Sequence, residues 1–271
     1  MTNNSGKVRT KDFLWLNIRE LPYFRGLLRA VEGLVYQEYD LVSPVLDLGC
    51  GDGQFASVTF DKQLDVGIDP WKGPIREANQ SGKYRLVLQG NGDKLPFKDQ
   101  YFSSAISNSV LEHIEDIEPV LKEMSRVLKQ GSFFIFCVPN QNFLNNLSIS
   151  SLLDRIGLQM FGDMYRNYFN TISRHHHCDS PEIWTKRLNK ADFAVEKWWH
   201  YFSPSALHVL EWGHYFGLPS LIIHSVFRRW IVVPKPWNLF ITRAIVEKYY
   251  RENSTQPAGS YTFYVARRRD H

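Results

Sequence analysis

The chain has 271 residues, of which 44% are hydrophobic and 22% carry a charge, and its formal net charge at pH 7 is +4. This length and apolar content are sufficient for an extensive hydrophobic core, so we expect a folded globular enzyme. Lys and Arg form no long basic run, and the sequence therefore gives no support to a nucleic-acid partner.

The cysteine content and the lack of long apolar segments indicate the cellular compartment. The chain has only three cysteines, which suggest no disulfide framework and fit a reducing cytoplasm. Residues 1–12 are polar and lack the apolar stretch of a secretory signal, and no segment has the roughly 18 uninterrupted apolar residues of a membrane span. We therefore expect a cytoplasmic protein without a transmembrane segment.

In chain order, the first feature is a run of apolar and aromatic residues at helical spacing, which Pro22 divides in two. It predicts an N-terminal helical cap over residues 1–40.

Residues 45–48 then form a short apolar strand with Asp47 inside it, and the turn Gly49-Cys50-Gly51-Asp52-Gly53 leads into a helix. Glycines at alternate positions let the backbone take positive φ angles and approach a ligand, so this turn predicts a cofactor site.

Further strands follow the turn. A second predicted strand ends in Asp69, the position from which a carboxylate accepts hydrogen bonds from ribose hydroxyls in doubly wound folds. A third strand, over residues 84–89, leads into a turn at residues 90–97 that can present an amide or a carboxylate to a purine ring. The alternation continues with a strand, a helix and a strand over residues 102–108, 120–129 and 133–138.

The series GCGDG, IDP, LPF, VLEH and RVLKQG resembles the class I S-adenosylmethionine-dependent methyltransferases of the type 11 group over residues 41–140, and more loosely over residues 175–203. The resemblance implies a doubly wound α/β fold with a mostly parallel seven-stranded sheet, and S-adenosylmethionine as the cofactor. A dinucleotide-binding site would share the glycine-rich turn and the acid at the end of the second strand. Phe55 stands where the dinucleotide pattern has Gly or Ala, which counts against that alternative.

By the same resemblance, Asp47 and the turn glycines hold the methionine part of the cofactor, and Asp69 holds the ribose. Asn91 stands at the adenine position, where the family commonly has an acid, and Asp93 is close enough to replace it. The choice stays open, since an asparagine carbonyl also accepts from an amine. The cofactor-binding residues predicted in this way are Asp47, Gly49, Cys50, Gly51, Gly53, Asp69, Asn91, Gly92, Asp93 and Asn108.

Residues 41–140 are thus expected to form the cofactor-binding core. Residues 141–271 are expected to complete the sheet, with strands near residues 194–201 and 260–266. Two insertions are interpreted as a substrate lobe, because open α/β sheets bind ligands near the carboxyl ends of their strands. These insertions are residues 141–180 and 203–259.

Residues 216–240 in the second insertion combine apolar side chains and tryptophans with basic residues. Such a segment suits a bilayer surface, where aromatic rings lie at the level of the headgroups. The alternative is that these residues are the core of the lobe, because several prolines interrupt any long amphipathic helix. The bilayer interpretation implies an apolar or lipid-linked methyl acceptor and peripheral membrane contact.

His113, which follows Glu112 at the start of a predicted helix, is the candidate catalytic base for a hydroxyl or amine acceptor. The alternative is that this Glu-His pair organises the local helix and loop.

A second cluster of potential ligands, His175, His176, His177 and Cys178, suggests a transition-metal site. No second ligand pair stands at a recognisable spacing, although His200, His208 and His214 could approach in space. No metal is therefore predicted. The histidines are interpreted as lining the substrate entrance or capping the helix that begins at Ser180.

The function predicted from the sequence is transfer of a methyl group from S-adenosylmethionine to an oxygen, nitrogen or carbon acceptor, which is a small molecule or a lipid-linked one. The alternative is a non-catalytic cofactor-binding or scaffold protein on the same fold. A nucleic-acid methyltransferase is disfavoured, because the chain has no Asn-Pro-Pro-Tyr type of signature. The sequence does not indicate an oligomeric state.

Overall fold

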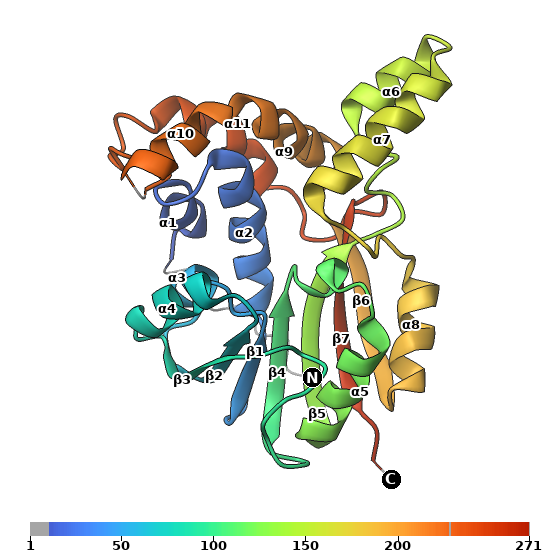
Figure 1. Cartoon of the computed structure of the whole chain (residues 1–271). Coiled ribbons are helices and arrows are strands. Elements are labelled where there is room, and N and C mark those ends of the chain that lie inside the picture. Colours follow the sequence, from blue (N-terminus) through green and yellow to red (C-terminus); the bar gives the residue numbers. More distant parts are fainter. Residues whose placement is uncertain (1–10, 228, 271) are drawn as a thin grey trace. The chain divides into compact units, whose positions relative to one another are not determined.

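The computed structural model describes residues 11–227 and 229–270 and divides the chain into two compact units (Figure 1). Among the described residues, one unit combines those up to Asp40 with Ser205–Ser254, and the other combines Leu41–Pro204 with those from Thr255 onward. Of the predicted N-terminal cap, residues 1–10 lie outside the described residues.

The larger unit contains a seven-stranded sheet in the order β3-β2-β1-β4-β5-β7-β6. Its strands are β1 Val45–Leu48, β2 Leu64–Asp69, β3 Tyr84–Gln89, β4 Phe102–Asn108, β5 Leu128–Pro139, β6 Phe193–Tyr201 and β7 Tyr261–Arg268. β1 to β5 pair in parallel, and β7 runs antiparallel between β5 and β6. The predicted doubly wound, mostly parallel sheet is confirmed.

The helices of this unit connect the strands or project from them. They are α3 Gln54–Thr59, α4 Lys72–Gln80, α5 Ile117–Val127, α6 Ser148–Arg155, α7 Gln159–Ser173 and α8 Pro181–Lys190. α6 and α7 form a hairpin that projects beyond the sheet (Figure 1). Glu112 and His113 lie in a separate 3₁₀ turn, η1 Leu111–His113, and not at the start of a helix, because Asp116 is extended and α5 begins only at Ile117.

The core of this unit lies between the central strands and α5. Leu46 of β1, Ala105 of β4 and Phe134 of β5 are fully buried in it. α5 is amphipathic and buries one face, which includes Val120, Leu121, Met124 and Val127. This packing fixes the carboxyl ends of β1, β2 and β4, where most of the predicted cofactor residues lie.

The smaller unit is helical. Its elements are α1 Phe13–Ile18, α2 Tyr23–Tyr36, α9 Pro204–Phe216, α10 Leu218–Phe227 and α11 Phe240–Tyr250. The predicted break is present, since Pro22 is the N-cap of α2. An ion pair of 2.8 Å between Asp12 and Arg243 joins the start of α1 to α11. None of the described helices in either unit has the length and apolar character needed to cross a membrane.

Candidate cofactor site

The glycine-rich turn joins β1 to α3. Gly49, Gly51 and Gly53 have φ angles of +78°, +56° and +78°, a region in which other residues are strained. The N–H groups of Gly49 and Cys50 donate to the carbonyl of Ile68, over 2.8 and 3.1 Å. These bonds fasten the start of the turn to the end of β2.

The glycines of this turn serve different purposes. A Cβ at Gly49 would lie 2.4 Å from Cγ1 of Val110, so glycine lets the turn after β4 pack against the turn after β1. A Cβ at Gly51 would have no atom of the described residues within 4 Å. The backbone at Gly51 is therefore open at the carboxyl edge of the sheet, where ligands of such folds bind.

Asp69, the last residue of β2, directs its carboxylate to the same turn. Its Oδ2 accepts a hydrogen bond from the N–H of Gly51 at 3.1 Å, and its Oδ1 accepts one from Trp71 at 2.9 Å. Burial raises the pKa of Asp69, although the two backbone N–H groups oppose this effect. Each carboxylate oxygen has a second lone pair, so Asp69 can also accept a hydrogen bond from a ribose hydroxyl.

Asp47 lies inside β1 and is buried. The hydroxyl of Tyr84, at the start of β3, donates to its Oδ2 over 2.6 Å. Burial, followed by the charge of Asp47, raises the pKa of the Tyr84 hydroxyl, so this group remains a donor. The Tyr84 ring packs closely against the turn and β2, since a Cβ at Gly53 or Gly67 would lie 3.2 or 3.0 Å from it.

Cys50 and Asn108 are also buried beside the turn. Burial, and then the charges of Asp47 and Asp69, raises the pKa of the Cys50 thiol, which disfavours a reactive thiolate. The side chain of Asn108 accepts a hydrogen bond from the thiol of Cys137 at 3.2 Å, which joins β4 to β5.

The predicted adenine residues follow β3. The N–H of Gly90 donates to the carbonyl of Asp69 at 3.1 Å, so this turn begins beside the end of β2. A Cβ at Gly92 would lie 3.0 Å from Val120 and 3.1 Å from Leu48, whereas Asn91 and Asp93 are exposed. The turn is thus packed against the core at Gly92 and presents two polar side chains on either side of it.

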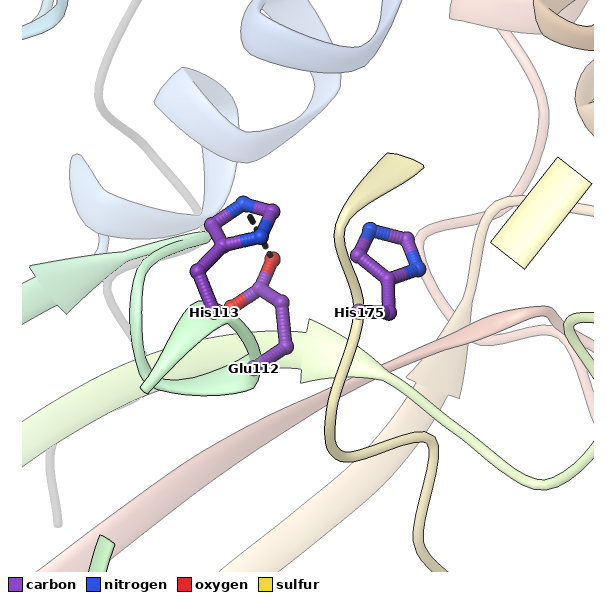
Figure 2. A group of neighbouring side chains, drawn as sticks. All are labelled: Glu112, His113 and His175. Atoms are coloured by element: carbon purple, nitrogen blue, oxygen red, sulfur yellow. Dashed lines mark ion pairs between the residues drawn. The ribbon is translucent and has the colours of Figure 1, made fainter. Parts of the chain in front are cut away.

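His113 lies next to a distant part of the chain. Its Nδ1 is 2.9 Å from the carbonyl oxygen of Arg174, which follows α7, and its Nε2 is 3.8 Å from Oε1 of Glu112. The ring of His175 lies beside it, with centroids 5.3 Å apart (Figure 2). The structure therefore brings the predicted base together with one of the clustered histidines.

The other members of the histidine cluster have separate contacts. The side chain of His177 lies 3.3 Å from Asp179 and 3.2 Å from the carbonyl of Glu115. His200 does not join this cluster, because its Nδ1 hydrogen-bonds to Thr262 at 2.7 Å, between β6 and β7. The spacing did not reveal the second group of potential ligands, Glu112 and His113. They precede His175 by 63 and 62 residues and are close to it only in space.

The sequence also missed Tyr84. It begins an ordinary apolar strand, and no motif marks its hydroxyl as the partner of Asp47. The only signal was a buried acid in β1, because such a carboxylate requires a donor from a neighbouring strand.

Comparison with known proteins agrees with this geometry. Residues 46–136 match the type 11 family model described as Methyltransferase domain. This stretch is a class I S-adenosylmethionine-dependent methyltransferase domain. The methyltransferase domain is also similar to MJ1123 of Methanocaldococcus jannaschii, with 33% identity over 103 residues, which are 38% of this chain and 48% of that protein. The chain thus spans about half the length of this relative.

Two solved structures share the fold of the methyltransferase domain and extend the similarity over most of the chain. One is an S-adenosylmethionine-dependent methyltransferase from Thermotoga maritima, with a TM-score of 0.55, 16% identity and 91% of each chain covered. The other is geranyl diphosphate C-methyltransferase from Streptomyces coelicolor A3(2), solved with Mg²⁺, geranyl diphosphate and S-adenosyl-L-homocysteine. Its TM-score is 0.55 at 14% identity, with 91% of this chain and 84% of that chain covered.

Proposed function

We propose that this protein transfers the methyl group of S-adenosylmethionine to an oxygen, nitrogen or carbon acceptor. The observation that carries the proposal is the left-handed glycine turn, whose Gly51 N–H is bonded to Asp69 and whose surface is open beside Gly51. A sulfonium carries both the electrophilic methyl group and its leaving group, so the protein mainly has to align the reactants and exclude water.

The residues of the site then have separate tasks. Asp69 accepts hydrogen bonds from the ribose hydroxyls, and the backbone of the glycine turn lies against the methionine part. Asp47, held by Tyr84, fixes the strand from which this turn starts. Cys50, Gly92 and Asn108 line the same edge.

Adenine recognition is assigned to the turn after β3, where Asn91 and Asp93 are both exposed. Calorimetric titration of Asn91→Ala and Asp93→Ala with S-adenosylhomocysteine separates the two. The residue that binds the exocyclic amine is the one whose loss weakens binding about 10-fold, the cost of one hydrogen bond to a ligand. Equal affinities in both variants and in the wild type would remove adenine recognition from this turn.

His113 is the proposed group for activation of a hydroxyl or amine acceptor. The carbonyl of Arg174 accepts a hydrogen bond from Nδ1–H, and in this tautomer the lone pair of the ring is on Nε2. A neutral imidazole of this kind can take a proton at neutral pH, a contribution of about 10²–10⁴-fold in rate.

We further propose that the acceptor is apolar or lipid-linked. The α6–α7 hairpin, which lies in the first predicted insertion, exposes an apolar face, and α7 leads directly into His175 beside His113. The exposed side chains of this face are Leu152, Ile156, Met160, Phe161, Met164 and Tyr168. Apolar side chains in such number suit an apolar ligand, because contact with it removes them from water.

The experiment has two stages. Calorimetric titration with S-adenosylmethionine tests cofactor binding, and release of S-adenosylhomocysteine in the presence of prenyl, fatty-acyl and short polar acceptors tests transfer. We expect binding, and turnover with a long-chain acceptor. Binding without turnover on any acceptor would favour the alternative, a non-catalytic cofactor-binding protein, and the absence of binding would overturn the proposal.

A further inference from the structure

Three side chains with metal-binding atoms meet beyond the end of β4. Glu112 and His113 come from η1, and His175 comes from the loop after α7. One ligand atom from each residue lies within 4.8 Å of the other two (Figure 2). Two imidazoles and one carboxylate are a ligand set that proteins use for divalent transition metals with open coordination positions.

The two segments are held together by their backbones. The N–H of His176 donates to the carbonyl of Glu112 at 2.7 Å, and the N–H of His177 donates to the same oxygen at 3.3 Å. The carbonyl of Arg174 receives the Nδ1–H of His113 at 2.9 Å. The cluster is therefore built into the fold and does not depend on a chance meeting of long side chains.

The hydrogen bonds of the two imidazoles also bear on metal binding. With Nδ1–H bonded to the carbonyl of Arg174, the lone pair of the His113 ring is on Nε2, which lies 3.8 Å from Oε1 of Glu112. Metal-bound histidines commonly use their other ring nitrogen in this way. The Nδ1 of His175 lies 3.7 Å from the Sγ of Cys178, and Asn170 donates to the carbonyl of His175 at 3.1 Å, which positions this residue as well.

Charge and exposure also favour a cation. Glu112 is only 1% exposed, and a buried carboxylate is stabilised by a cation beside it. The side chain of His113, in contrast, is 43% exposed, so one side of the cluster is open to solvent or to a ligand. Ligand atoms around zinc are about 3.4 Å apart, from bond lengths of about 2.0–2.1 Å, so a shift of about 1 Å by the two imidazoles closes the set.

We propose that Glu112, His113 and His175 bind one divalent transition-metal ion of the zinc class, with at least one coordination position open to the methyl acceptor. The role of this metal site rests on the proposed methyl transfer, whereas metal binding itself does not. The ion would bind the acceptor oxygen and lower the pKa of its hydroxyl, whose proton passes to water. The oxygen then forms a bond to the methyl carbon as the carbon–sulfur bond breaks, which gives a methyl ether and S-adenosylhomocysteine. His113 is a ligand in this scheme, and the ion takes over the activation of the acceptor.

The test is metal binding by the full chain, prepared without a polyhistidine tag and treated with EDTA. Isothermal titration with Zn²⁺, and the visible absorption spectrum with Co²⁺, should show one ion per chain. We expect His113→Ala and His175→Ala to weaken Zn²⁺ binding at least 100-fold, and Glu112→Gln at least 10-fold. His176→Ala is the matched control. The side chain of His176 is exposed and adjacent in sequence to His175, and the variant keeps the backbone N–H that donates to the carbonyl of Glu112.

Two results would overturn this inference. One is the absence of stoichiometric binding to the wild type, and the other is an equal loss of affinity in His175→Ala and His176→Ala, which indicates non-specific capture by the histidine cluster. Near-ultraviolet circular dichroism identifies variants that do not fold. Binding of S-adenosylmethionine is measured separately, so metal binding without cofactor binding leaves the metal site standing while the proposed function fails. If the protein binds no metal and its methyl transfer is insensitive to EDTA, the proposed function stands and the metal site fails.

Discussion

The hydroxyl of Tyr84 donates a hydrogen bond of 2.6 Å to the buried carboxylate of Asp47, and so joins the start of β3 to the strand that leads into the glycine turn. Tyr84→Phe removes this donor and leaves a buried carboxylate with one hydrogen bond fewer. We expect the free energy of unfolding to fall by about 1–3 kcal/mol. Urea denaturation measures the change, and affinity for S-adenosylhomocysteine should fall with it.

Tyr101→Phe is the control for loss of a tyrosine hydroxyl. Tyr101 is exposed just before β4, and we expect a change within about 0.5 kcal/mol, as at other surface positions. If Tyr84→Phe were as stable as Tyr101→Phe, Asp47 would not depend on this hydrogen bond.

A pair of glycine variants separates backbone strain from ligand contact. Gly51 has a φ of +56° and Gly82 a φ of +64°, and a Cβ at either would have no described atom within 4 Å. Alanine at each position should therefore reduce stability by a similar amount, about 1–2 kcal/mol. Only Gly51→Ala adds a methyl group at the proposed cofactor site, so it alone should weaken S-adenosylhomocysteine binding, by at least 10-fold in a calorimetric titration. Equal affinities in the two variants would place the cofactor elsewhere.

The pKa of Asp69 predicts the response to acid. Burial raises it above the ordinary value of 3.8, so protonation of Asp69 favours the folded state, and this group adds stability as the pH falls through the folded pKa toward 3.8. Protonation removes an acceptor that we propose for the ribose hydroxyls, so affinity for the cofactor should fall over the same range.

Titration of cofactor affinity against pH checks this expectation. In the wild type the decline should begin at a higher pH than an unperturbed aspartate would give, and in Asp69→Asn this part of the decline should be absent. A wild-type profile that is flat down to pH 3.8 would contradict the assignment of Asp69 to the ribose.

Exposed apolar side chains of the smaller unit predict contact with membranes. Trp237 is 75% exposed, Phe240 and Ile241 are exposed beside it, and Lys235 lies close in sequence. Within the segment of residues 216–240, Trp237 and Phe240 are thus exposed, whereas Leu239 is buried. The protein should co-float with vesicles that contain anionic lipid, and Trp237→Ala should reduce the bound fraction several-fold.

Trp71→Ala is the matched control, because Trp71 is 68% exposed but belongs to the larger unit. It should co-float like the wild type. Failure of the wild type to co-float, or equal losses in the two tryptophan variants, would count against membrane contact through this segment.

The sequence predicted the part of the fold that local patterns determine. Strands that end in Asp69 and Asn108 are short apolar runs bounded by turn residues, and their bounds agree with the structure. Glycines in the turn mark positive φ angles, because glycine is the residue that adopts them without strain.

The rest depends on contacts between distant segments. The bond between Tyr84 and Asp47 spans 37 residues, and the meeting of His113 with His175 spans 62. Neither contact produces a recognisable motif in the sequence. The Tyr84–Asp47 bond depends on the pairing of β2 with both of its neighbours, and the His113–His175 contact depends on the path of the α6–α7 hairpin. The 3₁₀ turn at Glu112 was missed for a similar reason, since Glu112 and His113 hydrogen-bond to the loop after α7.

Isothermal titration of the purified full chain with S-adenosylhomocysteine, beside Gly51→Ala and Asp69→Ala, tests the central claim most directly. We predict saturable binding of one molecule per chain to the wild type, with an affinity at least 10-fold weaker in each variant. Absence of binding to the folded wild-type protein at millimolar ligand, or wild-type affinity in both variants, would contradict the account.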